Sequence, residues 1–515
     1  MAESVKTNLV DKVVNYFSPQ RGSARLRARM FSAVVDDYIG ASRSMRSMFG
    51  FLPKSKSQDD TASLGRELLL SRSRYLVRNN AMAFGSIDSN CVNIVGTGLG
   101  LKSRIDRKYL GLTNEAANEI ESRMEREFSL FADSPNCDVA RTLNFYELTN
   151  QMLWQSFEAG EIFTLLPYFF RNGDVYGTKI QLIESERVCN EDNKNDTDRL
   201  VQGIEKDEYG APVKYHICSR YPGGRVSKAA EWSKIDAYRK NGLRNVLHHF
   251  IQRRPGQSRG IPYHTPIIEL LYNIGNLRKA ELDAYVVQSL FAVLIETEGA
   301  RGLGKMAPGE TGARGSDEDI KLAPGAVIDL KPGEKAVMTT PGRPGPNFDS
   351  FLTSLYQECG VGSSLPLQVF IKKYDTSFTS ARAAFGDAWK FWSTRRGWVA
   401  DSFCNPVYST VIHEAVARGR LALPGFLSDP LARRAYLGAE WVGPAQGQIN
   451  PVHEMTAAKI AVAEGWKTDE QVTEEIFGGD FDDNMEQRKR EIEAKTTAGI
   501  LGENRKINLI EKNEG

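Results

Sequence analysis

One stretch of the chain has the residue types of a phosphate-binding loop. Gly299, Gly304 and Lys305 follow the G-x-x-x-x-G-K spacing, in which backbone amides and a lysine cradle nucleotide phosphates. A working loop needs a Ser or Thr next, to help hold magnesium, and then a helix whose amides point at the phosphates. Met306 takes that place and a Pro-Gly pair follows, which opposes a helix. The sequence therefore disfavours hydrolysis, and a P-loop-like NTP-dependent nucleic-acid enzyme is kept as the alternative function.

A second glycine cluster could suggest dinucleotide binding. Gly96, Gly98 and Gly100 have the spacing G-x-G-x-G, and the residues that follow, from Leu101 to Arg104, are typical of a strand. The dinucleotide fingerprint requires a helix at that point, because the amides of its first turn bind the pyrophosphate. We therefore expect a tight connection into a strand.

Metal and nucleophile chemistry is equally weakly supported. The six cysteines form no C-x-x-C pair, so the sequence predicts neither a zinc site nor a disulfide framework. His413-Glu414 has no second histidine four residues on, and His248 and His249 lie in a strand-like run, where adjacent side chains face opposite ways. We expect no catalytic residues, no metal and no cofactor, and hence no enzyme.

The composition of the chain limits the classes of partner that it can bind. The 515 residues are 41% hydrophobic, with 66 Lys and Arg against 65 Asp and Glu, so the chain has no overall basic field for DNA. Residues 1–110 carry 18 basic against 9 acidic residues, and residues 451–515 carry 9 against 15. The longest nearly apolar run, 284–295, is shorter than the roughly 20 residues that span a bilayer. We expect no membrane partner.

The pattern along the chain predicts a mixed α+β fold. Helical spacing begins at Leu64 and ends at the pair Asn79-Asn80, and two more helices are expected within 114–160. Strand patterns with turn signals fill 163–250. Residues 1–63 are predicted to form an arm of low intrinsic order, in which Arg21, Arg25, Arg27 and Arg29 would either be solvated or contact nucleic acid.

A long helix is predicted from Thr265, as its cap, to Ile295, with Pro266 in its first turn. About 30 residues at 1.5 Å each make a rod of roughly 45 Å. Beyond Leu282 nearly every side is apolar, so the rod must be enclosed by its own chain or by copies of itself. The expected oligomer interface of this stem helix is Leu282, Tyr285, Val286, Leu290, Phe291 and Leu294.

The second half is predicted to return along that rod. Residues 297–346 are rich in Gly and Pro and should form a small β-containing module. A return helix follows, and a second long helix begins near Thr379 or Ser380. Its aromatic stripe, which includes Trp389 and Trp392, is expected to be core, and Pro406 should kink or break it.

Four short motifs follow one another along the chain: Val95-Gly96-Thr97-Gly98, Arg254-Pro255-Gly256-Gln257, Thr379-Ser380-Ala381-Arg382 and Asn405-Pro406-Val407-Tyr408. In this order and spacing they resemble the lambda-type portal proteins of tailed bacteriophages. A fifth and weaker match is Asn450-Pro451-Val452-His453-Glu454, where that family tends to have Lys before the Glu.

The resemblance implies a division into parts. These are an N-terminal arm (1–63), a mixed wing domain (64–262), a stem helix (263–296), a clip (297–346), a return stem helix (347–371), a tunnel loop (372–378), a long helix with the rest of the wing (379–450), and a helical crown and tail (451–515). The candidate residues facing DNA in the tunnel loop are Lys372, Lys373, Tyr374, Asp375, Thr376 and Ser377.

The same resemblance implies a function. Such proteins form a dodecameric ring at one capsid vertex, through which double-stranded DNA is packaged and ejected. The implied partners are the terminase large subunit, which supplies ATP hydrolysis, a major capsid or scaffold protein, a head-completion or tail adaptor, and non-specifically bound DNA. The implied location is the virion, with the host cytoplasm during assembly. A third interpretation, from the arginine-rich arm, is a DNA-binding adaptor.

Overall fold

The structure is a computed structural model that describes residues 9–25, 27, 50–63, 65–222, 231–290, 294–297, 334–337, 347–374, 377–447, 450–477, 479 and 481–498. The chain divides into two compact units, Met1–Ser57 and Gln58–Gly515. The first contains α1 (Leu9–Phe17). The sequence placed the end of this arm at 63, but α3 (Gln58–Ser63) belongs to the second unit, because Asp59 accepts a 2.9 Å hydrogen bond from the Ser258 amide.

Asparagine caps set the helix boundaries at the start of the second unit. The side chain of Asn80 accepts hydrogen bonds from the amides of Met82 and Ala83 at 2.9 and 3.2 Å. Asn80 thus starts a new helix directly after the previous one, as the preference of Asn for caps explains. The predicted helix end and the two helices within 114–160 are confirmed. The helices are α4 (Arg66–Asn79), α5 (Ala81–Ile94), α6 (Arg107–Leu110), α7 (Asn114–Ala132) and α8 (Phe145–Glu158).

Antiparallel sheets follow, in the order β3-β2-β8, β4-β5-β6-β7 and β1-β11. β1 confirms that a strand follows the glycine cluster. In β8, His249 bonds Thr164 while its neighbour His248 bonds Glu161, so the two side chains face opposite ways as predicted. The strands are β1 (Gly100–Ser103), β2 (Glu161–Leu165), β3 (Gln181–Ile183), β4 (Leu200–Val201), β5 (Ile204–Lys206), β6 (Pro212–Cys218), β7 (Trp232–Asp236), β8 (Val246–Phe250) and β11 (Ala439–Val442).

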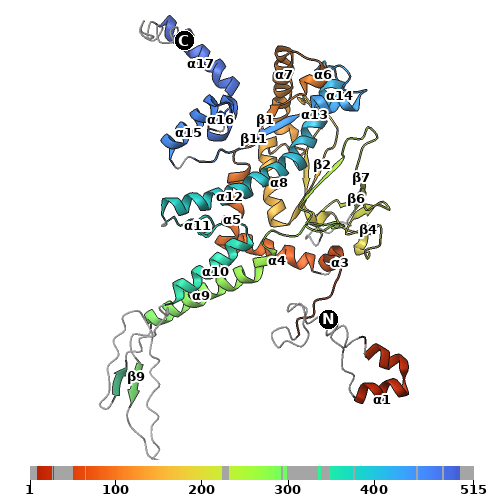
Figure 1. Cartoon of the computed structure of the whole chain (residues 1–515), viewed down its shortest axis with the longest axis vertical. Helices are drawn as coiled ribbons and strands as arrows, with labels where there is room; N and C mark the ends of the chain where they lie inside the picture. The colour runs from red at the N-terminus through yellow and green to blue at the C-terminus, as the bar shows by residue number, and fades with distance from the viewer. Residues whose placement is uncertain are drawn as a thin grey trace, which may run out of the picture. The chain divides into compact units, whose positions relative to one another are not determined.

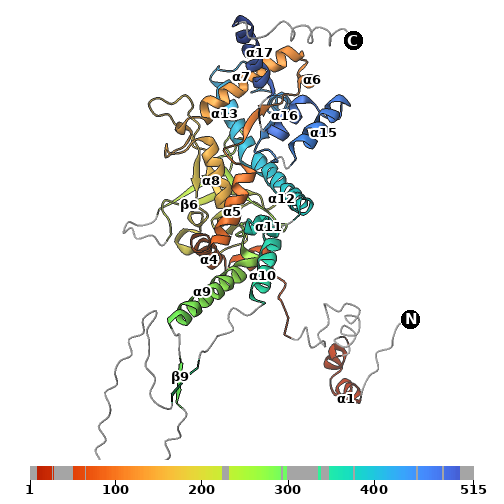
Figure 2. The same cartoon turned by 90° about the vertical axis from the view of Figure 1, so that its left-hand side faces the viewer.

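Two long helices, α9 (Ile268–Leu290) and α10 (Phe348–Gly362), pack side by side (Figures 1 and 2). The predicted rod was too long at its far end, because Leu294 lies in β9 (Leu294–Thr297), where it pairs with Val337 of β10 (Glu334–Val337). Backbone pairing with a distant segment overrode the helical pattern there. Thr265 is also not a cap: it lies in a 3₁₀ turn, and its hydroxyl donates to the Pro262 carbonyl at 2.7 Å.

The chain then passes through α11 (Leu367–Ile371) into the second long helix, α12 (Phe378–Val399). A π-helical turn, Ala400–Cys404, joins α12 to α13 (Asn405–Ala417), so Pro406 lies just after a distortion of the helix rather than at a full break. A π turn supplies the local slack that proline requires. In the aromatic stripe Trp392 is buried, which confirms its place in the core, whereas Trp389 is only partly buried.

The last part of the second unit is helical, as predicted. It comprises α15 (Pro451–Ala463), α16 (Asp469–Phe477) and α17 (Phe481–Thr497), after the short α14 (Pro430–Tyr436). Asn450 caps α15 by accepting a hydrogen bond from the His453 amide at 3.4 Å. Among the described residues, no helix combines the length and the apolar character that a bilayer crossing requires.

Candidate functional site

The loop that leads into α9 carries the Arg-Pro-Gly-Gln motif, and it folds around one side-chain amide. The oxygen of Gln257 accepts from the Arg253 amide at 2.9 Å, and its nitrogen donates to the Arg259 carbonyl at 2.8 Å. Gly256 takes a φ of +75°, which favours glycine. Gln257 therefore holds both ends of the loop, and the next residues, Ser258 and Arg259, are buried in the protein interior.

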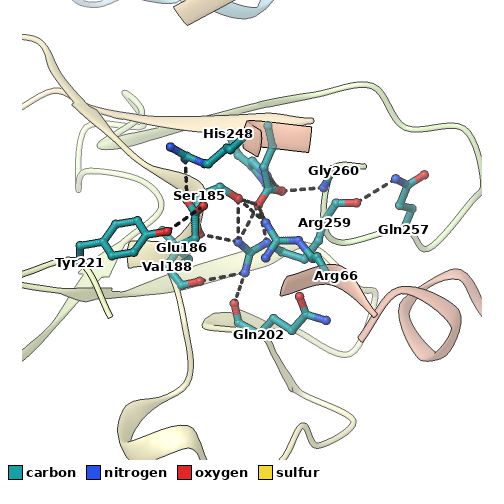
Figure 3. Close-up of polar contacts among 12 residues, drawn as sticks. Arg66, Ser185, Glu186, Val188, Gln202, Tyr221, His248, Gln257, Arg259 and Gly260 are labelled. Atoms are coloured by element: carbon teal, nitrogen blue, oxygen red, sulfur yellow. Dashed lines mark hydrogen bonds and ion pairs between the residues drawn. The ribbon is translucent and has the colours of Figure 1, made fainter. Parts of the chain in front are cut away.

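Arg259 is the cation that this loop places in the interior, and it is a large, fully buried side chain. Its Nε donates to Glu161 at 2.8 Å, and its terminal nitrogens donate to the carbonyls of Val188 and Ser185 at 2.9 and 2.8 Å. A further bond reaches the carbonyl of Gln202. Figure 3 shows these groups gathered around the guanidinium. The sequence alone gave Arg259 no role.

Glu161 is the anion at the centre of this network, and it is completely buried. Besides Arg259 it binds Arg66, accepts from Ser185 and the Gly260 amide at 2.6 Å each, and accepts from His248 at 2.9 Å. Burial by itself would raise the pKa of Glu161, but the charges of Arg259 and Arg66 and the His248 hydrogen bond hold that pKa well below its ordinary value. The Glu161 carboxylate is therefore ionised in the folded protein at neutral pH.

The backbones on either side of this network are in very close contact. A Cβ on Gly160, where φ is +83°, would lie 2.1 Å from the carbonyl carbon of Ile261, and a Cβ on Gly260 would lie 2.2 Å from the Gly160 oxygen. Only glycine fits at either position. Together with Arg259, these glycines fix the entrance of α9 to β2. The motif thus anchors the entrance of the long helix α9 to the sheet that contains β2, and its chemistry is structural.

The predicted tunnel loop connects α11 to α12. Lys372 ends α11 in the left-handed region, with φ of +53°, and its Nζ lies 4.0 Å from a carboxylate oxygen of Asp88. Tyr374 stacks on Phe385, with ring centroids 5.5 Å apart, and Ser377 accepts from the Ser380 amide as the N-cap of α12. Lys373 is exposed, and Asp375 and Thr376 lie outside the described residues.

Arg382 links two of the sequence motifs. It belongs to the Thr-Ser-Ala-Arg motif on α12, and its guanidinium lies 3.8 Å from a carboxylate oxygen of Glu454 on α15. Glu454 is the last residue of the Asn450 motif. Sequence reasoning listed the two motifs separately, because nothing local to either reveals that they meet.

Of the predicted stem interface, α9 carries the first three residues on its exposed surface. Leu282 is 63% exposed, Tyr285 46% and Val286 53%. Leu290 ends the helix, Phe291 lies outside the described residues, and Leu294 belongs to β9 instead of the helix.

The described residues hold no cluster of histidine, cysteine or carboxylate side chains fit for a metal. The buried histidines lie apart and have their own partners, such as Ser86 for His264 at 2.8 Å and Glu205 for His216 at 2.6 Å. All six cysteines are free thiols. The phosphate-loop candidate, residues 299–305, lies outside the described residues, as does Arg29, while Arg21, Arg25 and Arg27 are exposed.

Residues 44–396, more than half of the chain, match the family model described as phage portal protein, lambda family. The chain belongs to the lambda family of phage portal proteins. The family predicted from the motifs is thus confirmed, and with it the mixed α+β portal fold. Three of the four motifs lie inside the matched segment, and the Asn405 motif lies beyond its end.

Two phage portal proteins are similar to the chain over most of its length. The chain is 24% identical to portal protein B of Escherichia phage lambda over 452 residues, 84% of each chain. It is also 24% identical to the portal protein of Escherichia phage N15 over 473 residues, 88% of each. Among solved structures, a chain from the neck of an empty gene transfer agent particle matches at 14% identity with a TM-score of 0.43, covering 83% of this chain and 95% of that one.

As a lambda-family portal protein, the chain serves as the capsid portal channel for DNA packaging and as a head-to-tail connector.

Proposed function

We propose that copies of this chain close into a dodecameric ring whose wall is formed by α9 and α10. The observation that carries this proposal is the exposed apolar stretch of α9 at Leu282, Tyr285 and Val286. On α10, Phe351 and Val361 are exposed as well, at 54% and 76%. Burying one such side chain contributes about 1.5–3 kcal/mol. Contacts of one helix pair with the next copy would supply that burial around a closed ring.

Mass photometry and negative-stain imaging of the purified protein test the ring. The double variant L282E/V286E places two charges in the proposed contact and should yield subunits or short arcs in place of rings. L431E is the matched control, because Leu431 on α14 is 61% exposed but lies away from the stem. A wild-type protein that stays monomeric, or an L282E/V286E variant that closes as readily as L431E, contradicts the proposal.

We further propose that the α11–α12 connection, residues 372–377, faces the DNA. Lys372 and Lys373 would contact the phosphate backbone transiently. A chain with nearly balanced charge suits this task, because strong phosphate neutralisation would hold the DNA and stall its passage. The Tyr374–Phe385 stack and the Ser377 cap would hold the connection in position while DNA moves past it.

Charge reversal at both lysines tests this assignment. K372E/K373E should reduce DNA packaging or retention while rings still assemble, because the change repels phosphate without touching the stem. K108E/K240E is the control, since both lysines are exposed in the wing and carry the same charge change. Equal packaging by the two double variants would rule out a role of these lysines in DNA contact.

The remaining partners follow from the family. We propose that the terminase large subunit docks on residues 297–346, that head-completion or tail adaptors later replace it there, and that the chain resides at the capsid vertex after assembly in the host cytoplasm. ATP hydrolysis would belong to the terminase. The isolated ring should therefore hydrolyse no ATP, and K305A should package DNA as the wild type does, whereas turnover that K305A abolishes would favour the phosphate-loop enzyme.

The third interpretation, a DNA-binding adaptor, is tested separately by deleting the N-terminal arm. If residues 1–57 carried the DNA affinity, their deletion would abolish a salt-dependent association with duplex DNA. We expect deletion to leave that weak affinity nearly unchanged.

A further inference from the structure

Two adjacent arginines on α12 have opposite surroundings. Arg396 donates to the carbonyls of Ile94 and Asn93 at 3.0 Å each and to that of Pro444 at 2.8 Å. Arg395, also half-buried, has no hydrogen bond or ion pair from its guanidinium to any residue of the described ranges, and only lies over the Phe391 ring at 5.1 Å. Removing a charged group from water without a partner costs free energy, so Arg395 would bind an anion favourably.

Arg395 lines a pocket of about 310 Å³ at the junction of the wing and α9. Two further arginines, Arg253 and Arg254, line it from the motif loop. Arg254 donates to Gln58 at 3.4 Å, whereas the side chain of Arg253 has no carboxylate partner among the described residues. Burial lowers the pKa of Arg395, Tyr263 opposes that shift, and the charge of Arg253 adds to it. Arg253 and Arg395 repel each other across the pocket, and an oxyanion between them would relieve that repulsion.

The remaining residues that line the pocket indicate which kind of molecule the anion belongs to. Leu153, Phe157, Pro262 and Trp398 give the pocket an apolar floor. A phosphate of duplex DNA is hydrated and lies on the convex surface of a thick rod, so it fits such a recess poorly. A carboxylate on its short apolar stem, as in Asp or Glu of a polypeptide, matches both the apolar floor and the guanidinium forks.

The position of the pocket favours a second copy of this chain as the source. Thr265 and Pro266, which lead into α9, also line it. The pocket therefore lies at the entrance of the helix whose later residues, Leu282 and Val286, are exposed and form the proposed contact between copies. We infer that the Arg253–Arg395 pocket receives an acidic side chain of the neighbouring copy and locks adjacent subunits at the level where stem meets wing. This inference rests on the ring proposed above.

A zero-length crosslink tests it directly. In R395K a lysine ammonium replaces the guanidinium. A carbodiimide couples an amine to a carboxylate in contact with it: an amide bond forms, and the carbodiimide takes up the water that is lost and becomes a urea. Rings of R395K should give crosslinks between copies, with mass spectrometry locating residue 395 joined to an Asp or Glu. R72K is the control, because Arg72 is an exposed arginine of α4 outside the pocket.

A second variant measures the strength of the contact. R395Q should raise the dissociation constant of the subunits about tenfold, since truncating one partner of a desolvated charge pair costs this much or more, while R72Q should have little effect. The inference is overturned if R395K rings crosslink between copies no more than R72K rings. It is equally overturned if R395Q leaves the rings intact but weakens binding to a 20-base-pair duplex. Failure of the wild type to form rings would appear before any variant is tested, and would overturn the ring itself.

Discussion

Replacing Arg259 by Met should be one of the most destabilising single changes in the protein. The substitution keeps an apolar stem of similar length but removes a guanidinium that is 1% exposed, next to a Glu161 side chain that is 0% exposed. Breaking a buried ion pair by removing one partner costs about 3–5 kcal/mol. The carbonyls of Val188 and Ser185 lose their donors as well, at about 1 kcal/mol or more each, offset in part by apolar burial. We expect a loss of about 4 kcal/mol.

A double-mutant cycle isolates the pair from these other effects. E161Q keeps the shape of the side chain but leaves two buried cations without a counter-charge, so it should also cost about 4 kcal/mol. In R259M/E161Q neither charge of the pair remains. The double variant should lose about 5 kcal/mol in place of the additive 8, which corresponds to a coupling energy of about 3 kcal/mol.

Urea unfolding followed by tryptophan fluorescence measures these differences, at one protein concentration because assembly couples stability to concentration. R104M is the matched control. Arg104 also bonds carboxylates, Glu440 at 3.2 Å and Glu470 at 2.9 Å, but its side chain is 40% exposed. Exposed pairs contribute at most about 1 kcal/mol. Our reasoning about burial is refuted if R259M costs no more than R104M, or if the losses in the double variant simply add.

Three further predictions concern stability. Burial lowers the pKa of His264 from 6.5 to about 4. The buried neutral imidazole therefore stabilises the fold above pH 6.5, and this stability is lost as the pH falls toward 4. The free energy of unfolding should fall by about 2 kcal/mol between pH 7 and pH 5, and H264Q should reduce this pH dependence in urea titrations. G160A should abolish folding, judged by circular dichroism, because backbone lies where its Cβ must go, whereas G173A, also at positive φ but with open space, should cost about 1 kcal/mol. W392F should cost about 1–3 kcal/mol, because the side-chain oxygen of Asn90, which accepts from Trp392 at 2.9 Å, would be left unpaired. W466F, at an exposed position, should be neutral in the same urea titrations.

Local signals in the sequence predicted local structure well. Asn80 marked a helix boundary because its side chain caps the following helix, and the alternation at His248 and His249 followed from strand geometry alone. Prediction failed where a distant partner competes with the local pattern. Leu294 continues an apolar helical pattern, yet it pairs with Val337, 43 positions further along the chain, since a strand ladder satisfies its backbone as well as a helix would.

The sequence by itself determined the family, the long helices and the strand-rich segment between 163 and 250, because periodicity, caps and ordered motifs are properties of short segments. Only the tertiary structure decided which charged residues meet. Glu161 and Arg259 are 98 positions apart, and Arg382 and Glu454 lie in separate motifs. Neither pairing leaves a trace in composition or spacing, because a buried charge is tolerated only where the folded chain brings its counter-charge to it. The sequence likewise does not distinguish Arg395 from its neighbour Arg396. Only the structure shows that Arg396 bonds backbone carbonyls whereas Arg395 lies over the Phe391 ring.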